Sequence, residues 1–299
     1  MFLATIDPMS RRRLISLFTG ATLFAALLTL SVRAQQVPAA SGARILLLPR
    51  RIVSGEHATL AVLDINGRLT PGVAVTFSNG DHLKTDTTGR ALFVAPLDPG
   101  SISAAITGRS GRVYTTILSR GDAASPSAEV LLAPRIASLA DRFELTGHGF
   151  CGDADANRVT IAGLPALVLA SSPTSLVVLP PVDLEPGEAD VQLSCAKSDA
   201  SPFSVKFVAL SLEADSSPLK AGDHRALTVR VRGTTSKVPL EARNLAVDVA
   251  ELSGGNPSKV SSSGGADNSA QFELVGRQRG NFVVSIHLLS TQSAPHHSN

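Results

Sequence analysis

The residues best suited to chemistry form a short acidic run, Asp153-Ala-Asp155-Ala-Asn157. Oxygen-bearing side chains at alternate positions begin many calcium loops, because Ca²⁺ takes about six to eight oxygen ligands. An EF-hand also needs a glycine at the sixth position and a glutamate at the twelfth, where this chain has Arg158 and Leu164. The pattern therefore excludes an EF-hand. It leaves Asp153, Asp155 and Asn157 as candidate ligands of a calcium site in a loop between strands, with a solvated polar loop as the alternative.

Two cysteines, Cys151 and Cys195, lie on either side of this run. In an exported protein a cysteine pair forms a disulfide by default. A bridge between positions 44 residues apart would stabilise the fold by about 4 kcal/mol in the chain-entropy account. Two separate buried thiols remain the alternative, because sequence does not give the distance between the two residues.

The sequence lacks the common catalytic motifs. It has no Gly-x-Ser-x-Gly elbow, His-Glu-x-x-His helix, phosphate-binding loop or dinucleotide glycine fingerprint. Its seven histidines show no metal-ligand spacing, and its serines fall in strands and turns. We therefore predict a protein that is not an enzyme, with no catalytic residues and no cofactor. A hydrolase that arose by convergence is the least favoured alternative.

One strand has a polar face that could bind a partner. Residues 226–232 alternate, and one face carries Leu227, Val229 and Val231 while the other carries Thr228, Arg230 and Arg232. Arg230 and Arg232 are therefore candidate binding residues. The ligand itself is not indicated by the sequence.

Charge and aromatic content narrow the classes of partner. The net charge of the whole chain is +2, and that of residues 1–34 alone is +3, so the remainder has a net charge of about −1. The remainder therefore has no electrostatic reason to bind nucleic acid or anionic lipid. The chain has no tryptophan and one tyrosine, which disfavours stacking on single-stranded nucleic acid and aromatic platforms for sugars. We expect a protein or a cell-surface ligand instead.

The N-terminus has the features of an export signal. Arg11, Arg12 and Arg13 precede an apolar run over 14–32, and Val32-Arg33-Ala34 fits a cleavage site before Gln35. Residues 1–34 are thus predicted to be a cleaved signal peptide, with a retained membrane anchor as the alternative because the run approaches spanning length. The segment around the three arginines also resembles a twin-arginine motif, and an ordinary basic segment is the other possibility. Either route predicts an exported protein in the periplasm, at the cell surface or in the medium.

Residues 35–43 are predicted to be a flexible tether and 44–119 a first β-sandwich. Short strands over 45–48, 58–63, 73–77, 91–94, 102–106 and 113–118 are separated by turn residues such as Asn66-Gly67 and Pro71-Gly72. We expect the strand over 58–63 to be half-buried, because it alternates. This order of strands and turns is similar to bacterial immunoglobulin-like repeats of the invasin/intimin type and equally to carboxypeptidase-regulatory-like domains. Either resemblance implies a non-catalytic sandwich.

After a predicted linker over 120–128, residues 129–210 carry a more specific pattern. It includes Pro134-Arg-Ile136-Ala-Ser-Leu139, then Phe143-Glu-Leu145-Thr-Gly147-His-Gly149-Phe150, then Val159-Thr-Ile161-Ala-Gly163-Leu-Pro165. This stretch resembles an IPT/TIG domain, a small immunoglobulin-like β-sandwich. The resemblance implies that Gly147 to Phe150 form the fold, with small residues where the chain leaves its strand and Phe150 turned into the core. The two cysteines are an addition to the usual pattern.

Residues 211–290 are predicted to form a third immunoglobulin-like sandwich, with long flexible connections over 254–257 and 261–265. Residues 291–299 are predicted to be a disordered tail. The expected fold class is therefore all-β: three serial immunoglobulin-like β-sandwiches after a cleaved signal peptide. The module types imply a non-catalytic binding, adhesion or spacer role at a bacterial cell envelope. An accessory or sensor subunit that binds another envelope protein is the alternative.

Overall fold

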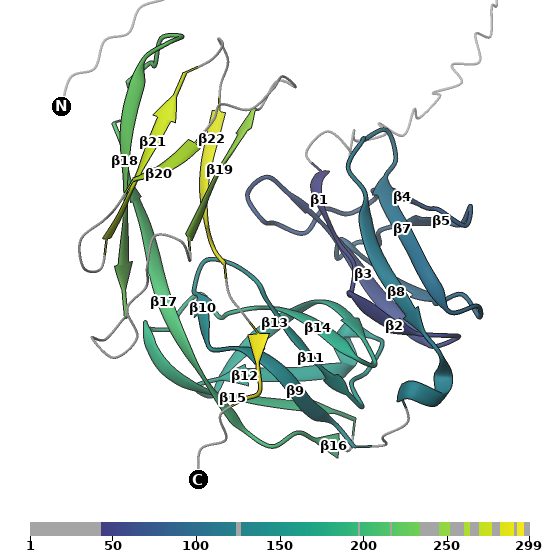
Figure 1. The fold of residues 1–299 in the computed structure, drawn as a ribbon. Helices are drawn as coiled ribbons and strands as arrows, with labels where there is room; N and C mark the ends of the chain where they lie inside the picture. The colour runs from purple at the N-terminus through teal and green to yellow at the C-terminus, as the bar shows by residue number, and fades with distance from the viewer. Residues whose placement is uncertain are drawn as a thin grey trace, which may run out of the picture. The chain divides into compact units, whose positions relative to one another are not determined.

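The computed structural model describes residues 43–123, 127–196, 198–215, 217–233, 245–251, 260–263, 269–276, 282–289 and 292–295 (Figure 1). These residues form strands and two short 3-10 turns, so the expected all-β class is confirmed. None of them belongs to a helix long and apolar enough to cross a membrane. The predicted signal peptide, most of the tether, the connection over 254–257 and the last four residues lie outside the described residues.

The N-terminal part contains eight strands that form two sheets around one apolar core. The strands are β1 (Ala43–Leu47), β2 (Arg51–Val53), β3 (His57–Asp64), β4 (Ala74–Phe77), β5 (His82–Lys84), β6 (Arg90–Val94), β7 (Gly100–Ile106) and β8 (Val113–Leu118). One sheet has the order β1-β3-β6, and the other has the order β2-β8-β7-β4-β5. Leu60, Val62, Val75 and Ile117 are among the buried residues between the two sheets.

Strand β3 differs from its prediction. Residues 58–63 are all buried, so the strand is covered on both faces rather than one. Ala58, Leu60 and Val62 face the core of the N-terminal part, whereas Ala61 and Leu63 belong to a second cluster. That second cluster includes residues from further along the chain, so tertiary packing covers the face that alternation alone assigned to solvent.

The central part packs a second pair of sheets. Its elements are β9 (Glu129–Pro134), β10 (Ile136–Ser138), β11 (Phe143–His148), the 3-10 turn η2 (Ala154–Ala156), β12 (Asn157–Ile161), β13 (Leu164–Ser172), β14 (Ser175–Leu179), β15 (Gly187–Cys195), β16 (Ser198–Asp199) and β17 (Phe203–Glu213). Strand β13 pairs first with β12 and then with β14, so one strand joins both sheets. Leu145, Ile161, Leu176 and Phe207 are among the residues of this core.

The C-terminal part is built on the far end of β17. Its strands are β18 (His224–Arg232), β19 (Leu245–Glu251), β20 (Val260–Ser263), β21 (Ser269–Val275) and β22 (Phe282–Leu288). Residues 187–191 of β15 pair with the first half of β17, and β18 pairs with the second half. Leu227, Val229 and Val231 are buried and Arg230 and Arg232 are exposed, which confirms the two faces expected for residues 226–232.

Four segments expected to be irregular carry regular structure in part. Ser261–Ser263 of the predicted connection lie in β20, because they pair with β21. Gln292 and Ser293 of the predicted disordered tail form β23 (Gln292–Ser293), because they add to the edge of β9. Arg120–Ala123 of the predicted linker form the 3-10 turn η1, and Ala43 of the predicted tether begins β1.

The two glycines at the end of β11, Gly147 and Gly149, have the steric role that was expected of them. A Cβ atom on Gly147 would overlap the carbonyl oxygen of Glu129, and one on Gly149 would overlap that of Ser127. Gly149 also has a φ of +71°, which L-residues rarely adopt. Phe150 follows with its ring buried in the central core, as predicted.

Two alanine substitutions, at Gly149 and at Gly163 in the turn between β12 and β13, separate the effect of a positive φ from that of the close backbone approach. Gly163 has a φ of +78° but open space around it, so Gly163→Ala should cost about 1 to 2 kcal/mol for the positive φ alone. Gly149→Ala adds the overlap with Ser127 and should cost about 1 to 3 kcal/mol more. Urea unfolding of both variants measures the difference. Equal costs would show that the close backbone approach at Gly149 is not a constraint.

Candidate functional site

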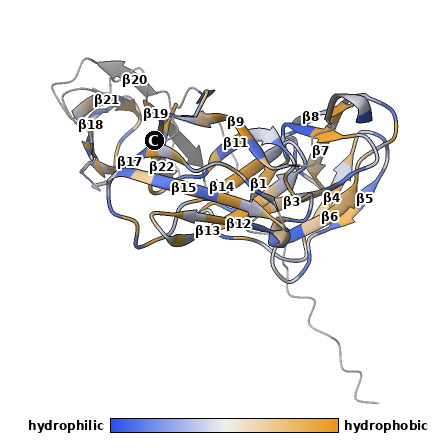
Figure 2. Cartoon of the chain, turned by 90° about the horizontal axis from the view of Figure 1, so that it is seen from below, coloured by the Kyte–Doolittle hydropathy of each residue, from blue (hydrophilic) through white to orange (hydrophobic). Residues whose placement is uncertain are grey.

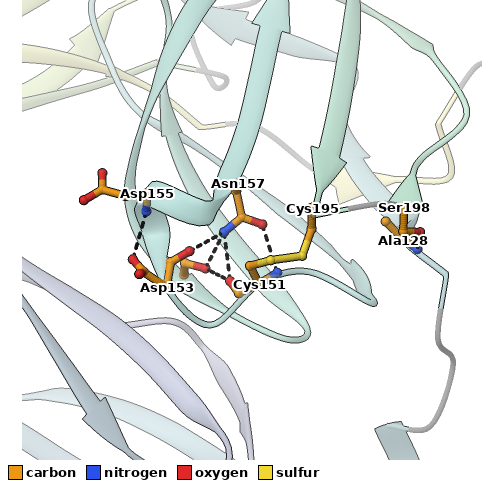
Figure 3. The surroundings of a disulfide bond; sticks show 8 residues. Ala128, Cys151, Asp153, Asp155, Asn157, Cys195 and Ser198 are labelled. Carbon is orange, nitrogen blue, oxygen red and sulfur yellow. Dashed lines mark hydrogen bonds between the residues drawn. A yellow bond between two sulfur atoms is a disulfide. The ribbon is translucent and has the colours of Figure 1, made fainter.

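The disulfide predicted between Cys151 and Cys195 is present, with a Cα–Cα distance of 5.6 Å (Figure 3). It links the chain just after β11 to the last residue of β15. Cys195 also pairs in register with Asn157 at the start of β12. The bond therefore fixes both ends of the loop over 151–157, which we call the stapled loop.

Asn157 closes the stapled loop from inside. Its side-chain oxygen accepts a hydrogen bond from the Cys151 amide at 3.0 Å, and its amide nitrogen donates to the carbonyls of Cys151 and Asp153 at 2.8 and 2.9 Å (Figure 3). The side chain also donates to the hydroxyl of Ser171 at 3.0 Å. The residue is 7% exposed. A buried amide with its hydrogen bonds satisfied holds the loop in one conformation.

The other two candidate calcium ligands also have protein partners. The Asp153 carboxylate accepts from the Asp155 amide at 3.0 Å and so caps η2. The Asp155 carboxylate pairs with the Arg90 guanidinium at 2.7 Å. Within the described part of the chain, no group of three or more His, Cys, Asp or Glu side chains is placed to hold a metal ion. The loop calcium site therefore stays a hypothesis, and the observed role of these residues is to shape the loop.

The stapled loop is also where the N-terminal and central parts meet. Thr59 of β3 donates from its hydroxyl to the carbonyl of Gly152 at 2.8 Å and accepts from the amide of Ala154 at 3.1 Å. Arg90 is 8% exposed and donates to the carbonyl of Val168 at 3.1 Å as well as to Asp155. Sequence analysis missed both residues, although each is a polar residue at or within an apolar strand.

An apolar cluster lies beneath these polar contacts. Leu47, Ala61 and Leu63 of the N-terminal part pack with Leu169 and Ala170 of β13. Ser171 of β13 also pairs with Thr59 of β3, so the two strands are joined by one antiparallel bridge. We call this contact, from Leu47 to Ala170, the β3–β13 seam.

A cleft opens beside the same two parts. It has a volume of about 490 Å³, and its lining includes Leu47, Tyr114, Phe143 and Glu144. The Glu144 carboxylate pairs with the Arg50 guanidinium at 2.8 Å and accepts from the Ser175 hydroxyl at 2.8 Å. Tyr114 is the only tyrosine of the chain, and it is 66% exposed. The lining is mixed, because apolar side chains such as Leu47 and Phe143 alternate with polar ones such as Arg50 and Glu144.

The candidate arginines of β18 lie apart from this cleft in the sequence and in a different sheet. Arg230 pairs with Glu213 of β17 at 2.6 Å, and this hydrogen bond raises the pKa of Arg230 above its ordinary value. Both side chains are exposed, so the pair contributes little to stability. Arg232 is exposed at the end of the same strand. The structure therefore does not bring Arg230 and Arg232 together with the stapled loop.

One histidine of the C-terminal part is half-buried and contacts the central part. Its ring nitrogen Nδ1 lies 2.7 Å from a carboxylate oxygen of Asp141, and Nε2 lies 3.2 Å from the hydroxyl of Ser285. This residue, His287 of β22, thereby joins the C-terminal part to the segment before β11 of the central part. Burial alone would raise the pKa of Asp141, but the hydrogen bond with His287 and the neighbouring Arg142 outweigh it and lower that pKa.

The end of the described chain returns to the central part. Gln292 of β23 donates from its side chain to the carbonyl of Glu144 at 3.0 Å, and it also lines the cleft. The sequence carries no signal for this contact, because a two-residue strand has no measurable alternation.

No protein-family model matches the chain, and no curated protein matches it in sequence. Solved structures of multi-domain proteins give distant matches. The glycan-utilisation protein SGBP-B of Bacteroides ovatus is 12% identical, with a TM-score of 0.29 over 80% of this chain and 73% of that one. The plexin A4 extracellular region is 10% identical, with a TM-score of 0.32 over 85% of this chain and 28% of that one. The S-layer protein SbsC is 13% identical, with a TM-score of 0.21 over 85% of this chain and 40% of that one.

These likenesses are too distant to carry a function. The all-β character of the chain rests on its own strands. The function must therefore come from the chain's own sequence and contacts.

The Asp141 carboxylate gives a pH test of the contact with His287. Because the folded-state pKa of Asp141 is lowered, its stabilising effect is present above its unfolded pKa of about 4 and is lost as the pH falls through the folded value. Asp141→Asn should lower the free energy of unfolding by about 1 to 3 kcal/mol at pH 7, and this gap should shrink as the pH falls below about 4.

Urea unfolding of the wild type and the variant between about pH 7 and pH 3 measures this gap. Asp183→Asn, at an exposed aspartate, is the matched control and should change little at either pH. A gap of the same size throughout the range would contradict the role assigned to the Asp141 carboxylate.

Proposed function

We propose that the chain is an exported, non-catalytic protein of three serial immunoglobulin-like sandwiches, the central one of the IPT/TIG type. Its role is binding, adhesion or spacing at a bacterial cell envelope. The basic and apolar residues over 11–34 support export, and the Cys151–Cys195 disulfide fits an oxidising compartment. The lack of catalytic motifs in the sequence supports a protein that binds rather than transforms its partner.

The observation that carries this proposal is the way consecutive parts are fastened to one another. Domains joined only by linkers move relative to each other by default. Here the β3–β13 seam, the Arg90–Asp155 pair and the Thr59 hydrogen bonds fasten the N-terminal part to the central part. Strand β17 continues from the central sheet into the C-terminal sheet without a break. Such fastening suits a protein that must hold a binding surface at a set place.

The cleft beside Tyr114 is the surface we assign to the partner. Its exposed aromatic ring and its arginine–glutamate pair resemble the mixed apolar and polar composition of protein interfaces. The alternative role, an accessory subunit of an envelope complex, would use the same cleft for one protein partner. The two roles differ in what the purified chain captures.

Fractionation of the native host with N-terminal sequencing tests export first. We expect a chain that starts at Gln35 outside the cytoplasm, and a chain that keeps residues 1–34 in the membrane would contradict the cleaved signal.

Capture experiments then test binding. Binding to intact cells or matrix supports adhesion, whereas one stoichiometric envelope protein supports the accessory role. Tyr114→Ala should weaken either kind of binding by about tenfold or more. Leu167→Ala, at an exposed position on β13, is the matched control and should leave binding unchanged. Equal binding by wild type and Tyr114→Ala would exclude the cleft.

A second candidate function is hydrolysis, because one cluster has the atoms of a nucleophilic triad. Ser285, His287 and Asp141 are linked in the order hydroxyl, imidazole and carboxylate, which is the order used by serine hydrolases. Acyl transfer also needs donors aimed at the developing oxyanion, and the triad atoms alone do not supply them.

A fluorophosphonate probe separates the two functions. We expect no labelling of Ser285, because the proposed role is non-catalytic. Labelling that is lost in Ser285→Ala would overturn the non-catalytic proposal and establish the hydrolase.

A further inference from the structure

Strand β6 is an edge of its sheet with an unusual composition. Residues 91–97 read Ala-Leu-Phe-Val-Ala-Pro-Leu and contain no charge. Leu92, Val94 and Leu97 are 49%, 54% and 79% exposed, so three of the large exposed hydrophobic side chains fall within six residues. Figure 2 colours β6 and the other strands by the hydropathy of their residues. Natural sheets protect such edges with charged residues, bulges or covering segments, because an open apolar edge pairs with other strands.

The backbone of β6 shows which groups are open. The strand pairs with β3 alone, and the Ala95 amide donates to the carbonyl of Glu56 in that ladder. Backbone groups alternate in direction along a strand, so residues 91, 93 and 95 face β3 while 90, 92 and 94 face away from it. Among the described residues, none bonds to the outward backbone groups of Leu92 and Val94. A groove of about 280 Å³ lies beside Val94 and Pro96, between the edge and β5.

At both ends of this stretch the outward backbone groups are not available for pairing with another strand. The backbone oxygen of Arg90 accepts from the Asp86 amide at 2.7 Å, and the Arg90 amide donates to the Asp86 carboxylate at 3.2 Å. At the other end Pro96 has no amide hydrogen to offer. The open edge therefore consists of two residues, Leu92 and Val94, with four backbone groups.

We infer that β6 is a self-association edge, which pairs antiparallel with β6 of a second copy of this chain about a twofold axis at Phe93. In this register Leu92 of each copy lies opposite Val94 of the other. All four outward groups of each copy are then paired. Arg90 lies opposite Pro96, so the residues whose groups are taken or missing face each other.

The neighbouring registers leave groups unpaired. A twofold axis at Leu92 would place Val94 opposite Arg90, whose backbone groups are already bonded to Asp86. An axis at Val94 would place Leu92 opposite Pro96, which cannot donate. An unpaired buried backbone group is costly, so the register centred on Phe93 is selected.

The same register also suits the side chains. Leu92 and Val94 of both copies would lie on one face and form a four-residue apolar cluster, and no charge opposes another there. A ladder this short buries well under the roughly 1,600 Å² of a standard interface, so the dimer should be weak and should depend on concentration. The second copy is favoured over an unrelated strand because the two ends of the edge are complementary to each other.

Sedimentation of the purified exported chain from about 1 μM to about 1 mM tests the inference. The weight-average mass should rise toward twice the monomer mass. Val94→Lys should keep the chain monomeric across the range, because it places two like charges beside the twofold axis. Leu167→Lys, at an exposed site on a strand that is paired along its length, is the control and should behave as the wild type. A monomer at every concentration, or a dimer unaffected by Val94→Lys, would overturn the inference.

Cysteine cross-linking tests the register independently. Residues in a hydrogen-bonded antiparallel pair have Cα atoms about 5.5 Å apart, which suits a disulfide, whereas diagonal neighbours lie about 7 to 8 Å apart. An equal mixture of the Leu92→Cys and Val94→Cys variants should therefore form a disulfide-linked dimer on oxidation, and neither variant alone should do so. Linkage of either variant alone as readily as the mixture would overturn the register centred on Phe93.

Discussion

The burial of β3 on both faces is the constraint on which much of the described structure depends. One face closes the core of the N-terminal part, and the other forms the β3–β13 seam with Leu169 and Ala170. A strand that is buried on both faces cannot slip by one residue without exposing one apolar set. The register of β3 therefore fixes the N-terminal sandwich and its contact with the central part at the same time.

The polar contacts around the seam depend on this register. Thr59 is the one polar residue among 58–63, and it meets the stapled loop at Gly152 and Ala154. The loop can receive it because the disulfide and the buried Asn157 side chain hold its backbone in one conformation. Arg90 adds a nearly buried guanidinium that is paired with a carboxylate and a carbonyl. Loss of either partner would leave a buried charge partly unsatisfied.

Local signals were sufficient to predict most strands and the disulfide. Residues 226–232 alternate cleanly and proved one-sided, and the resemblance over 129–210 assigned Gly147 and Gly149 to the fold. The contacts between parts could not be predicted in this way. Nothing local marks Thr59 as a partner of Gly152, since the two are 93 residues apart. The two-residue strand β23 is likewise too short for any pattern to reveal it.

The candidate sites show the same limit in another form. The run from Asp153 to Asn157 places oxygen-bearing side chains in one loop, but spacing does not show whether these atoms are already bonded to other protein groups. In the structure the Asn157 side chain donates a hydrogen bond to the carbonyl of Cys151 inside the loop, and the Asp155 carboxylate pairs with Arg90. Tyr114 was discounted because one tyrosine cannot make a platform, yet its exposure beside the cleft depends on the contact between two parts of the chain.

The sheet edges at β2, β5 and β9 are covered or short, and the exception, β6, bears on the proposed binding role. The edge of β9 is covered by β23, and β2 and β5 are edges of only three residues each, which limits how far another strand could pair with them. β6 has none of these protections, although its first residue, Arg90, is held in the contact with the central part. The N-terminal part is therefore fastened at one end of β6 and open along the rest. A chain that keeps its parts in fixed contact while leaving one apolar edge open can hold that edge in position for a partner.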